Sequence, residues 1–205
     1  MAHNAPAGQQ RYEPLAASVQ AALHGSVADR ASPMLVFATP QQGRAWLAAM
    51  SQRLAEHIAD QKTRVDFLTT VQYEAKRAGL DPQMVLGLIE VESRFRKYAV
   101  SRAGARGYMQ VMPFWVDLIG DAKHDLFKLR TNLRYGCVIL RHYLDIEGGD
   151  IYRALGRYNG SLGSKSSYAA KVVRAWHTRW LFPRDGATRA YAGGAVPLRH
   201  RERAQ

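Results

Sequence analysis

Two carboxylates, Glu90 and Glu92, lie two residues apart in residues 86–96, LGLIEVESRFR, a stretch that otherwise has the composition of a buried helix. A carboxyl group on a buried helix face is unfavourable when it is ionised and unpaired, so burial raises its pKa. A carboxyl group that stays protonated near neutral pH is what a general acid requires. The question is therefore which of the two glutamates, if either, transfers a proton.

The helical register separates the two glutamates. Each residue of a helix advances by about 100°, so Ile89 and Phe95 fall within about 60° of Glu92, which lies in the middle of the apolar face. Glu90 is rotated by about 160° from Glu92, and Arg94 follows it four residues later, in the order that favours a surface ion pair. We predict that Glu90 is solvated and that Glu92 is the general acid. From this helix alone, Glu92 could equally be a structural carboxylate neutralised by an arginine or by backbone N–H groups.

A glycine-bracketed turn follows the carboxylate helix, in residues 101–113, SRAGARGYMQVMP. Glycines such as Gly104 and Gly107 let the backbone pass close to another group. An amide and a hydroxyl group beside apolar side chains can orient a sugar and its N-acetyl group. Taken singly these residues are unspecific, since a methionine such as Met109 is more often a core residue than a site residue.

Four motifs together resemble the lytic transglycosylase domain, which is related to goose-type lysozyme. They are EVESRF, SRAGARGYMQVMP, NLRYG at residues 132–136 and ALGRYNGS at residues 154–161. Their order and spacing match over about residues 77–180, roughly half of the chain, and four motifs in register argue against accidental agreement. The resemblance implies a lysozyme-like, all-α or mainly α-helical catalytic domain that acts on peptidoglycan.

The resemblance also assigns roles to individual residues. It implies that Glu92 is the catalytic acid/base, that Ser93 is its usual companion, and that the hydroxyl of Tyr158 approaches the catalytic carboxyl group. Asn132 is expected to support the loop that holds the site. The remaining substrate-binding positions are Ser101, Gln110, Met112 and Asn159.

This chain departs from the usual pattern of that domain at two places. Residues 157–161 read Arg-Tyr-Asn-Gly-Ser where the family commonly has Ala-Tyr-Asn-Ala-Gly, and Tyr108 replaces a frequent leucine. Neither departure removes a functional group. The shape of the sugar groove is the property that these departures affect.

The implied reaction cleaves the β-1,4 bond between MurNAc and GlcNAc without adding water and leaves a 1,6-anhydro-MurNAc end. Glycosidases usually employ two carboxylates, whereas only Glu92 is placed here by both arguments; Asp117, Asp121 and Asp125 carry no comparable signature. The alternatives are a goose-type hydrolase with a second carboxylate near Glu92 and a non-catalytic wall-binding module. A nucleic-acid binder would need a basic helix or an aromatic and basic platform, and neither is visible, so no nucleic acid is expected as a partner.

The hydrophobic pattern predicts helices with short connections and no alternating strand pattern, which again indicates an all-α or mainly α fold. The predicted helices span residues 42–60, 63–78, 81–97, 114–119, 131–146, 150–158 and 167–180. Residues 1–41, in which only two apolar patches look able to dock, are interpreted as a poorly ordered arm. The other predicted units are a helical extension that packs on the domain at 42–76, the lytic transglycosylase domain at 77–182 and a basic flexible tail at 183–205.

The composition of the chain limits which partners, metals and locations can be expected. With 29 Lys+Arg against 17 Asp+Glu, the net charge of +12 attracts polyanions such as nucleic acid, anionic lipid or the bacterial cell wall. Cys137 is the only cysteine and is predicted to be buried, and the seven histidines show no ligand spacing, so we expect no metal and no cofactor. No signal peptide and no transmembrane segment are visible. Because peptidoglycan lies outside the cytoplasm, the resemblance favours a bacterial periplasmic or envelope location and leaves open association with an envelope or secretion assembly.

Overall fold

The computed structural model describes residues 10–28, 31–164 and 167–182. Within these residues the fold is helical, and the extended structure is limited to isolated bridges that join Arg106 to Val100 and to Val111. The mainly α-helical class is therefore confirmed. No helix in the described part combines the length and the apolar character needed to cross a membrane. The helices are α1 Ala17–Val27, α2 Pro40–Leu54, α3 Gln61–Arg77, α4 Pro82–Ser93, α5 Phe114–Ile119, α6 Leu129–Ile146, α7 Ile151–Tyr158, α8 Tyr168–Ala175 and the π-helix η1 Trp176–Trp180.

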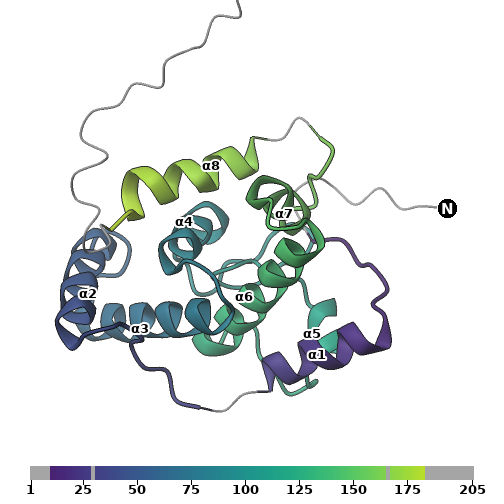
Figure 1. The fold of residues 1–205 in the computed structure, drawn as a ribbon, viewed down its shortest axis with the longest axis horizontal. Coiled ribbons are helices and arrows are strands. Elements are labelled where there is room, and N and C mark those ends of the chain that lie inside the picture. The colour runs from purple at the N-terminus through teal and green to yellow at the C-terminus, as the bar shows by residue number, and fades with distance from the viewer. Residues whose placement is uncertain (1–9, 29–30, 165–166, 183–205) are drawn as a thin grey trace, which may run out of the picture.

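Helix α4 lies at the centre of the molecule, with α8 across one side and α3 and α6 on the other (Figure 1). It begins where predicted, because the Asp81 carboxylate accepts hydrogen bonds from the backbone N–H groups of Gln83 and Met84. The helix ends at Ser93, earlier than predicted, because Arg94 adopts the left-handed conformation with φ 51°. The turn that follows leads directly into the loop at residues 101–113.

A close approach of two backbones fixes α4 against the C-terminal helices. A Cβ atom on Gly87 would lie 2.8 Å from the backbone nitrogen of Trp176 and 3.1 Å from the carbonyl oxygen of Val172. Any side chain at Gly87 would therefore separate α4 from the junction between α8 and η1. At this junction the single helix predicted for residues 167–180 changes to π-helical geometry.

The N-terminal segment differs from the poorly ordered arm that we predicted, because it contains α1. The C-terminal end of α1 is held by two distant arginines: Arg77 donates to the carbonyl of Ser26, and Arg134 donates to the carbonyl of Val27. Cations at the end of a helix satisfy its free carbonyls and oppose its dipole. Residues 1–9, also assigned to the arm, and the predicted basic tail at 183–205 lie outside the described residues.

The same two arginines belong to a buried ionic cluster centred on Glu74 of α3, whose side chain has no exposed surface. Arg134 approaches the Glu74 carboxylate at 2.9 Å, Arg77 at 3.1 Å and Arg130 at 3.2 Å. We call these four residues the Glu74 cluster. It joins α1, α3 and α6 through one carboxylate.

The helical extension predicted at residues 42–76 corresponds to α2 and most of α3. Helix α2 begins at a capping box formed by Thr39 and Gln42, and it packs against α3 and η1. Its last residue is Leu54, so the helix is shorter than predicted. Cys137 on α6 is buried, as predicted, and burial raises the pKa of its thiol.

Candidate functional site

Glu92 lies in the last turn of α4 and pairs with a hydroxyl group from α8. Tyr168, the first residue of α8, donates a hydrogen bond to Oε1 of Glu92 at 2.5 Å. The Glu92 side chain keeps some contact with solvent, yet desolvation by the surrounding protein raises its pKa to about 8, and the hydrogen bond from Tyr168 opposes part of this rise. Glu92 therefore holds a proton at neutral pH, as a general acid must.

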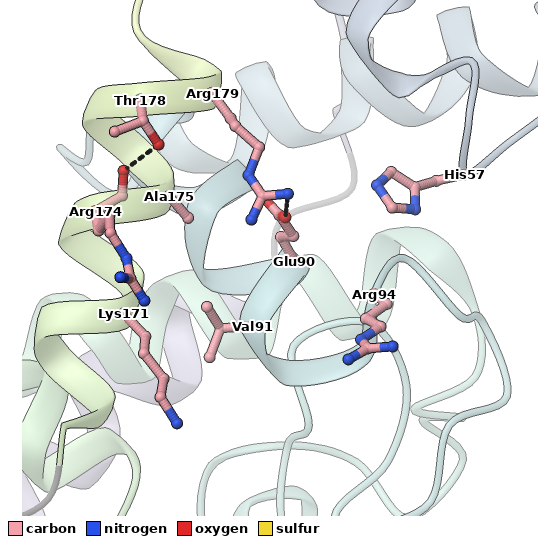
Figure 2. A pocket seen from close by; sticks show the side chains of 9 residues that line it. All are labelled: His57, Glu90, Val91, Arg94, Lys171, Arg174, Ala175, Thr178 and Arg179. Carbon is pink, nitrogen blue, oxygen red and sulfur yellow. Dashed lines mark hydrogen bonds and ion pairs between the residues drawn. The ribbon is translucent and has the colours of Figure 1, made fainter.

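Our prediction that Glu90 is solvated is wrong. It is only 8% exposed, and its carboxylate accepts a hydrogen bond from the indole nitrogen of Trp180 at 2.7 Å and pairs with Arg179 at 2.6 Å. Figure 2 shows Arg179 reaching from η1 to Glu90, while Arg94 lies beyond the end of α4 and bonds to Glu90 only through the backbone. The amphipathic pattern of α4 gave the wrong prediction because α8 and η1 cover the face of α4 that would be exposed to water in a surface helix.

Tyr158, whose hydroxyl group the resemblance implied to approach the catalytic carboxyl group, lies near Glu92 but makes its hydrogen bond elsewhere. Its hydroxyl group is fully buried and donates to the backbone carbonyl of Met109 at 2.8 Å. Burial, and then the nearby charge of Glu92, raise the pKa of Tyr158. The hydroxyl group that reaches Glu92 belongs to Tyr168, which sequence reasoning missed. The available signal was its position at the start of the last amphipathic helix, but only the packing of α8 on α4 gives that position a meaning.

Asn132 organises the loop at residues 101–113, as predicted. Its side-chain oxygen accepts from the backbone N–H of Met109 at 2.8 Å, and its NH₂ group donates to the carbonyls of Arg106 and Leu126 at 2.8 and 2.9 Å. Gly107 makes this contact possible, because its φ is +75° and a Cβ atom there would lie 2.4 Å from the Asn132 amide nitrogen. The prediction that Asn132 supports the site loop is confirmed.

We expect Asn132→Ala to lower the free energy of unfolding by about 2–3 kcal/mol, because it removes the partner of the buried Met109 N–H and of the Leu126 carbonyl, whereas the Arg106 carbonyl still accepts from the N–H of Val111. Urea denaturation of the variant and of Gln52→Ala, which changes an exposed residue of α2, would measure the effect. A loss below about 1 kcal/mol would show that the loop does not depend on Asn132.

The other predicted substrate-binding residues divide into two groups. Ser93 and Ser101 make local contacts: the Ser93 hydroxyl donates to the carbonyl of Ile89, and the Ser101 hydroxyl accepts from the N–H of Ala105. The Asn159 side chain is half-buried and makes no hydrogen bond to any residue that the structure describes, so it can serve a ligand.

The backbone groups of Gln110 and Met112 bond to the same side chain, that of Gln10. Gln110 has φ 49°, and its own side-chain amide donates to the carbonyls of Ala99 and Gly107, which holds this conformation. The carbonyl of Gln110 and the N–H of Met112 both bond to the side chain of Gln10, from the N-terminal segment. Among the described residues, no group of three or more His, Cys, Asp or Glu side chains is arranged to hold a metal ion.

Comparisons with known proteins place this chain among transglycosylase domains. The family model for the transglycosylase SLT domain matches residues 69–180, from the middle of α3 to the end of η1. Membrane-bound lytic murein transglycosylase C of Actinobacillus pleuropneumoniae serotype 5b is 42% identical over 73 residues, which are 36% of this chain and 20% of that protein. The transglycosylase of Enterobacteria phage PRD1 is 30% identical over 135 residues, 63% of this chain and 49% of the phage protein.

A solved structure of an inactive mutant of lytic transglycosylase Slt from Pseudomonas aeruginosa aligns with a TM-score of 0.43 and 18% identity, covering 68% of this chain and 27% of that one. This chain thus spans half or less of the length of the relatives named here. The family model, in contrast, covers more than half of this chain, including Glu92, Tyr168 and the loop held by Asn132. The chain therefore belongs to the transglycosylase SLT domain family.

Proposed function

We propose that this protein is a peptidoglycan lytic transglycosylase that cleaves the β-1,4 bond between MurNAc and GlcNAc without water. The observation that carries the proposal is the Glu92 carboxyl group, which is paired with the Tyr168 hydroxyl and has its pKa raised to about 8. Its location in a domain of the SLT family supports the same reaction. The names of the relatives, which are lytic murein transglycosylases and a phage transglycosylase, add further support.

In the proposed reaction, Glu92 first donates its proton to the glycosidic oxygen, and the bond from that oxygen to C1 of the muramic acid breaks. The carbonyl oxygen of the N-acetyl group on the same sugar stabilises the positive charge that develops at C1. The C6 hydroxyl then attacks C1 and gives its proton to the ionised Glu92. A 1,6-anhydro ring forms, Glu92 regains its proton, and no water is consumed.

A single carboxylate is enough for this sequence of steps, and the surroundings of Glu92 favour it. Within the described part of the chain, no other acidic residue contributes to the pKa shift of Glu92. Asp121 and Asp125 accept hydrogen bonds from backbone N–H groups in their own turns, and Asp117 is exposed. A hydrolase would be expected to have a second carboxylate to activate water, so the arrangement supports the lyase over the goose-type alternative.

The remaining site residues receive the following proposed roles. Tyr158 donates a hydrogen bond to the carbonyl of Met109 and so positions the loop at residues 101–113. It takes no part in the proton transfer. Tyr168 positions the Glu92 carboxyl group. We propose that the substrate contacts the groups lining the loop and the end of α7, namely Ser93, Ser101, Gln110, Met112 and Asn159.

The proposed location is the bacterial cell envelope, on its periplasmic side. A peptidoglycan substrate requires this location, and the name of the Actinobacillus relative places that protein at a membrane. The net charge of +12 would help to retain the protein on a wall that carries peptide carboxylates.

Mass spectrometry of the muropeptides released from purified peptidoglycan would test the proposed reaction. Products that are lighter by one water than the corresponding hydrolytic muropeptides, and that end in an anhydro sugar, are expected. Hydrated reducing ends would instead identify a hydrolase. Tight binding to the wall without any released product would identify a wall-binding module.

The pH dependence of the reaction supplies a separate prediction. Because the acid form of Glu92 is required, kcat/KM should fall as the pH rises through about 8. The Tyr168 hydroxyl lowers the pKa of Glu92, so Tyr168→Phe should raise that pKa and move the alkaline limb of the profile to higher pH. A pH profile of both proteins on the same glycan strands measures this, and a limb that stays in place, or moves to lower pH, would contradict the assigned role of Tyr168.

A further inference from the structure

A hollow of about 760 Å³ lies on the face of α4 that points away from Glu92, between α4 and the α8–η1 helices. Neither Glu92 nor Tyr168 lines it. Its wall instead includes Glu90, which is rotated by about 160° from Glu92 around the helix. The hollow is therefore a second concave surface, separate from the candidate site of cleavage.

The walls of this hollow are cationic. Lys171 and Arg174 extend from α8 on one side, and Arg94 lies across from them at the end of α4 (Figure 2). Arg179 reaches in from η1. We call these four side chains the cationic cluster. Among the described residues that line the hollow, Glu90 is the only carboxylate.

Three members of the cationic cluster have no partner within the described part of the chain. Arg179 is paired with Glu90 at 2.6 Å. Arg94, Lys171 and Arg174 form no ion pair and no side-chain hydrogen bond with any residue that the structure describes, and all three are exposed. Like charges gathered around one concave surface repel one another and attract a ligand of opposite charge. Their arrangement is unfavourable for folding alone and favourable for binding an anion.

The backbone geometry of η1 supports a role for the hollow beyond folding. Residues 176–180 form a π-helix, a geometry that is rare and frequently occurs at functional sites. Two consecutive side chains of η1, Arg179 and Trp180, both bond to the Glu90 carboxylate. These bonds hold η1 against α4 and fix the guanidinium group of Arg179 at the edge of the hollow.

The terminal segments of this chain outside the described part do not have the charge that the hollow requires. Residues 183–205 contain five arginines against two acidic residues, and residues 1–9 contain no acidic residue. A second copy of the chain carries the same net charge of +12, which opposes its approach. The hollow is therefore suited to a different, acidic molecule.

The floor of the hollow favours a peptide over a polymer of phosphate groups. Val91 and Ala175 line the hollow between its charged walls (Figure 2). From Lys171 to Thr178 the α8–η1 wall rises by about 10 Å, a length that about three extended peptide residues span. A peptide can place carboxylates against the cations and an aliphatic side chain against Val91, whereas a row of phosphates uses only the charges.

We propose that the cationic cluster binds an acidic peptide segment of a partner protein, with at least two carboxylates and an aliphatic side chain between them. The bound segment lies on the face of α4 opposite Glu92, so the partner and a glycan can bind at the same time. The hollow thus attaches the protein to its partner without closing the candidate catalytic site. This inference goes beyond the proposed function and does not depend on it.

The test is an NMR titration of the full chain with the acidic peptide Glu-Leu-Glu-Leu-Glu, and with Gln-Leu-Gln-Leu-Gln as its uncharged counterpart. The double variant Lys171→Ala/Arg174→Ala should bind the acidic peptide about tenfold more weakly than the unmodified protein. Added salt should weaken the binding to the unmodified protein. The double variant Arg44→Ala/Lys123→Ala removes the same charge from exposed positions elsewhere and should bind like the unmodified protein.

The same titration locates the bound peptide. The amide resonances of Val91 and Ala175 should shift, and those of Gln110 and Met112 should stay in place. Shifts at these two loop residues instead would place the peptide in the candidate glycan site and would overturn the proposal. Because the assay needs no cleavage, its result is independent of the proposed reaction.

Three other outcomes would also contradict the proposal. Equal binding of the acidic and the uncharged peptide would show that the cations do not select carboxylates. Equal weakening in both double variants would reduce the effect to the net charge of the protein. Binding of phosphatidylglycerol vesicles that requires the cationic cluster, without binding of the acidic peptide, would assign the hollow to a lipid surface.

Discussion

Glu92→Gln is expected to lower kcat/KM for the cleavage of peptidoglycan by about a thousandfold, because general acid–base catalysis by one positioned side chain contributes about 10²–10⁴. The amide keeps the size of the carboxyl group and can still contact Tyr168, but it cannot donate a proton to the glycosidic oxygen. Release of anhydro-muropeptides, followed by mass spectrometry, measures the loss.

Stability at two pH values provides the control for this variant. The folded-state pKa of Glu92, about 8, lies above the unfolded value near 4.5, so its contribution to stability is complete below the unfolded pKa and is lost as the pH rises to about 8. Glu92→Gln should therefore be as stable as the unmodified protein at pH 4 and more stable than it at pH 9. Activity that survives in the variant would show that Glu92 is not the general acid.

The Glu74 cluster gives the largest expected effect on stability. Glu74→Ala should lower the free energy of unfolding by about 3–5 kcal/mol, because removing one partner from a buried ion pair leaves uncompensated charge. Here the charge belongs to three arginines that surround a fully buried carboxylate. Urea denaturation followed by circular dichroism measures the change, and a loss below about 1 kcal/mol would contradict it.

Two further variants make the interpretation specific. Glu56→Ala removes an exposed carboxylate and should change stability by less than about 0.5 kcal/mol. Glu74→Gln retains the shape of the side chain but not its charge, so a similar loss in this variant would assign the effect to charge rather than to a cavity.

The sequence predicted a raised pKa for Glu92, which agrees with the structure, and it predicted several helix starts, because helix starts depend on neighbours in the chain. The Asp81 and Pro82 pair starts α4, and Asp150 starts α7, each through its own side chain. Glu90 was misjudged because its partners, Trp180 and Arg179, lie about ninety residues away. A pattern of polar and apolar residues on one helix cannot reveal that a charged residue faces another helix.

Helix α1 and Tyr168 escaped prediction for the same reason. The carbonyls at the end of α1 are bound by Arg77 and Arg134, which belong to other helices. Tyr168 acquires its importance only from the packing of α8 on α4. The assignment of the substrate-binding residues therefore remains a proposal that rests on family resemblance together with the local contacts of the loop.

The absence of a side chain at Gly87 has a consequence for the proposed reaction. Backbone lies directly against backbone where α4 meets the junction of α8 and η1, so no side chain there can rotate to let the two helices slide. This close contact lies on the same pair of helices that carries Glu92 on α4 and Tyr168 on α8. In the proposed reaction, the protonation state of Glu92 would then be set before the substrate arrives, and the energy of sugar binding would be free to distort the sugar rather than to assemble the catalyst.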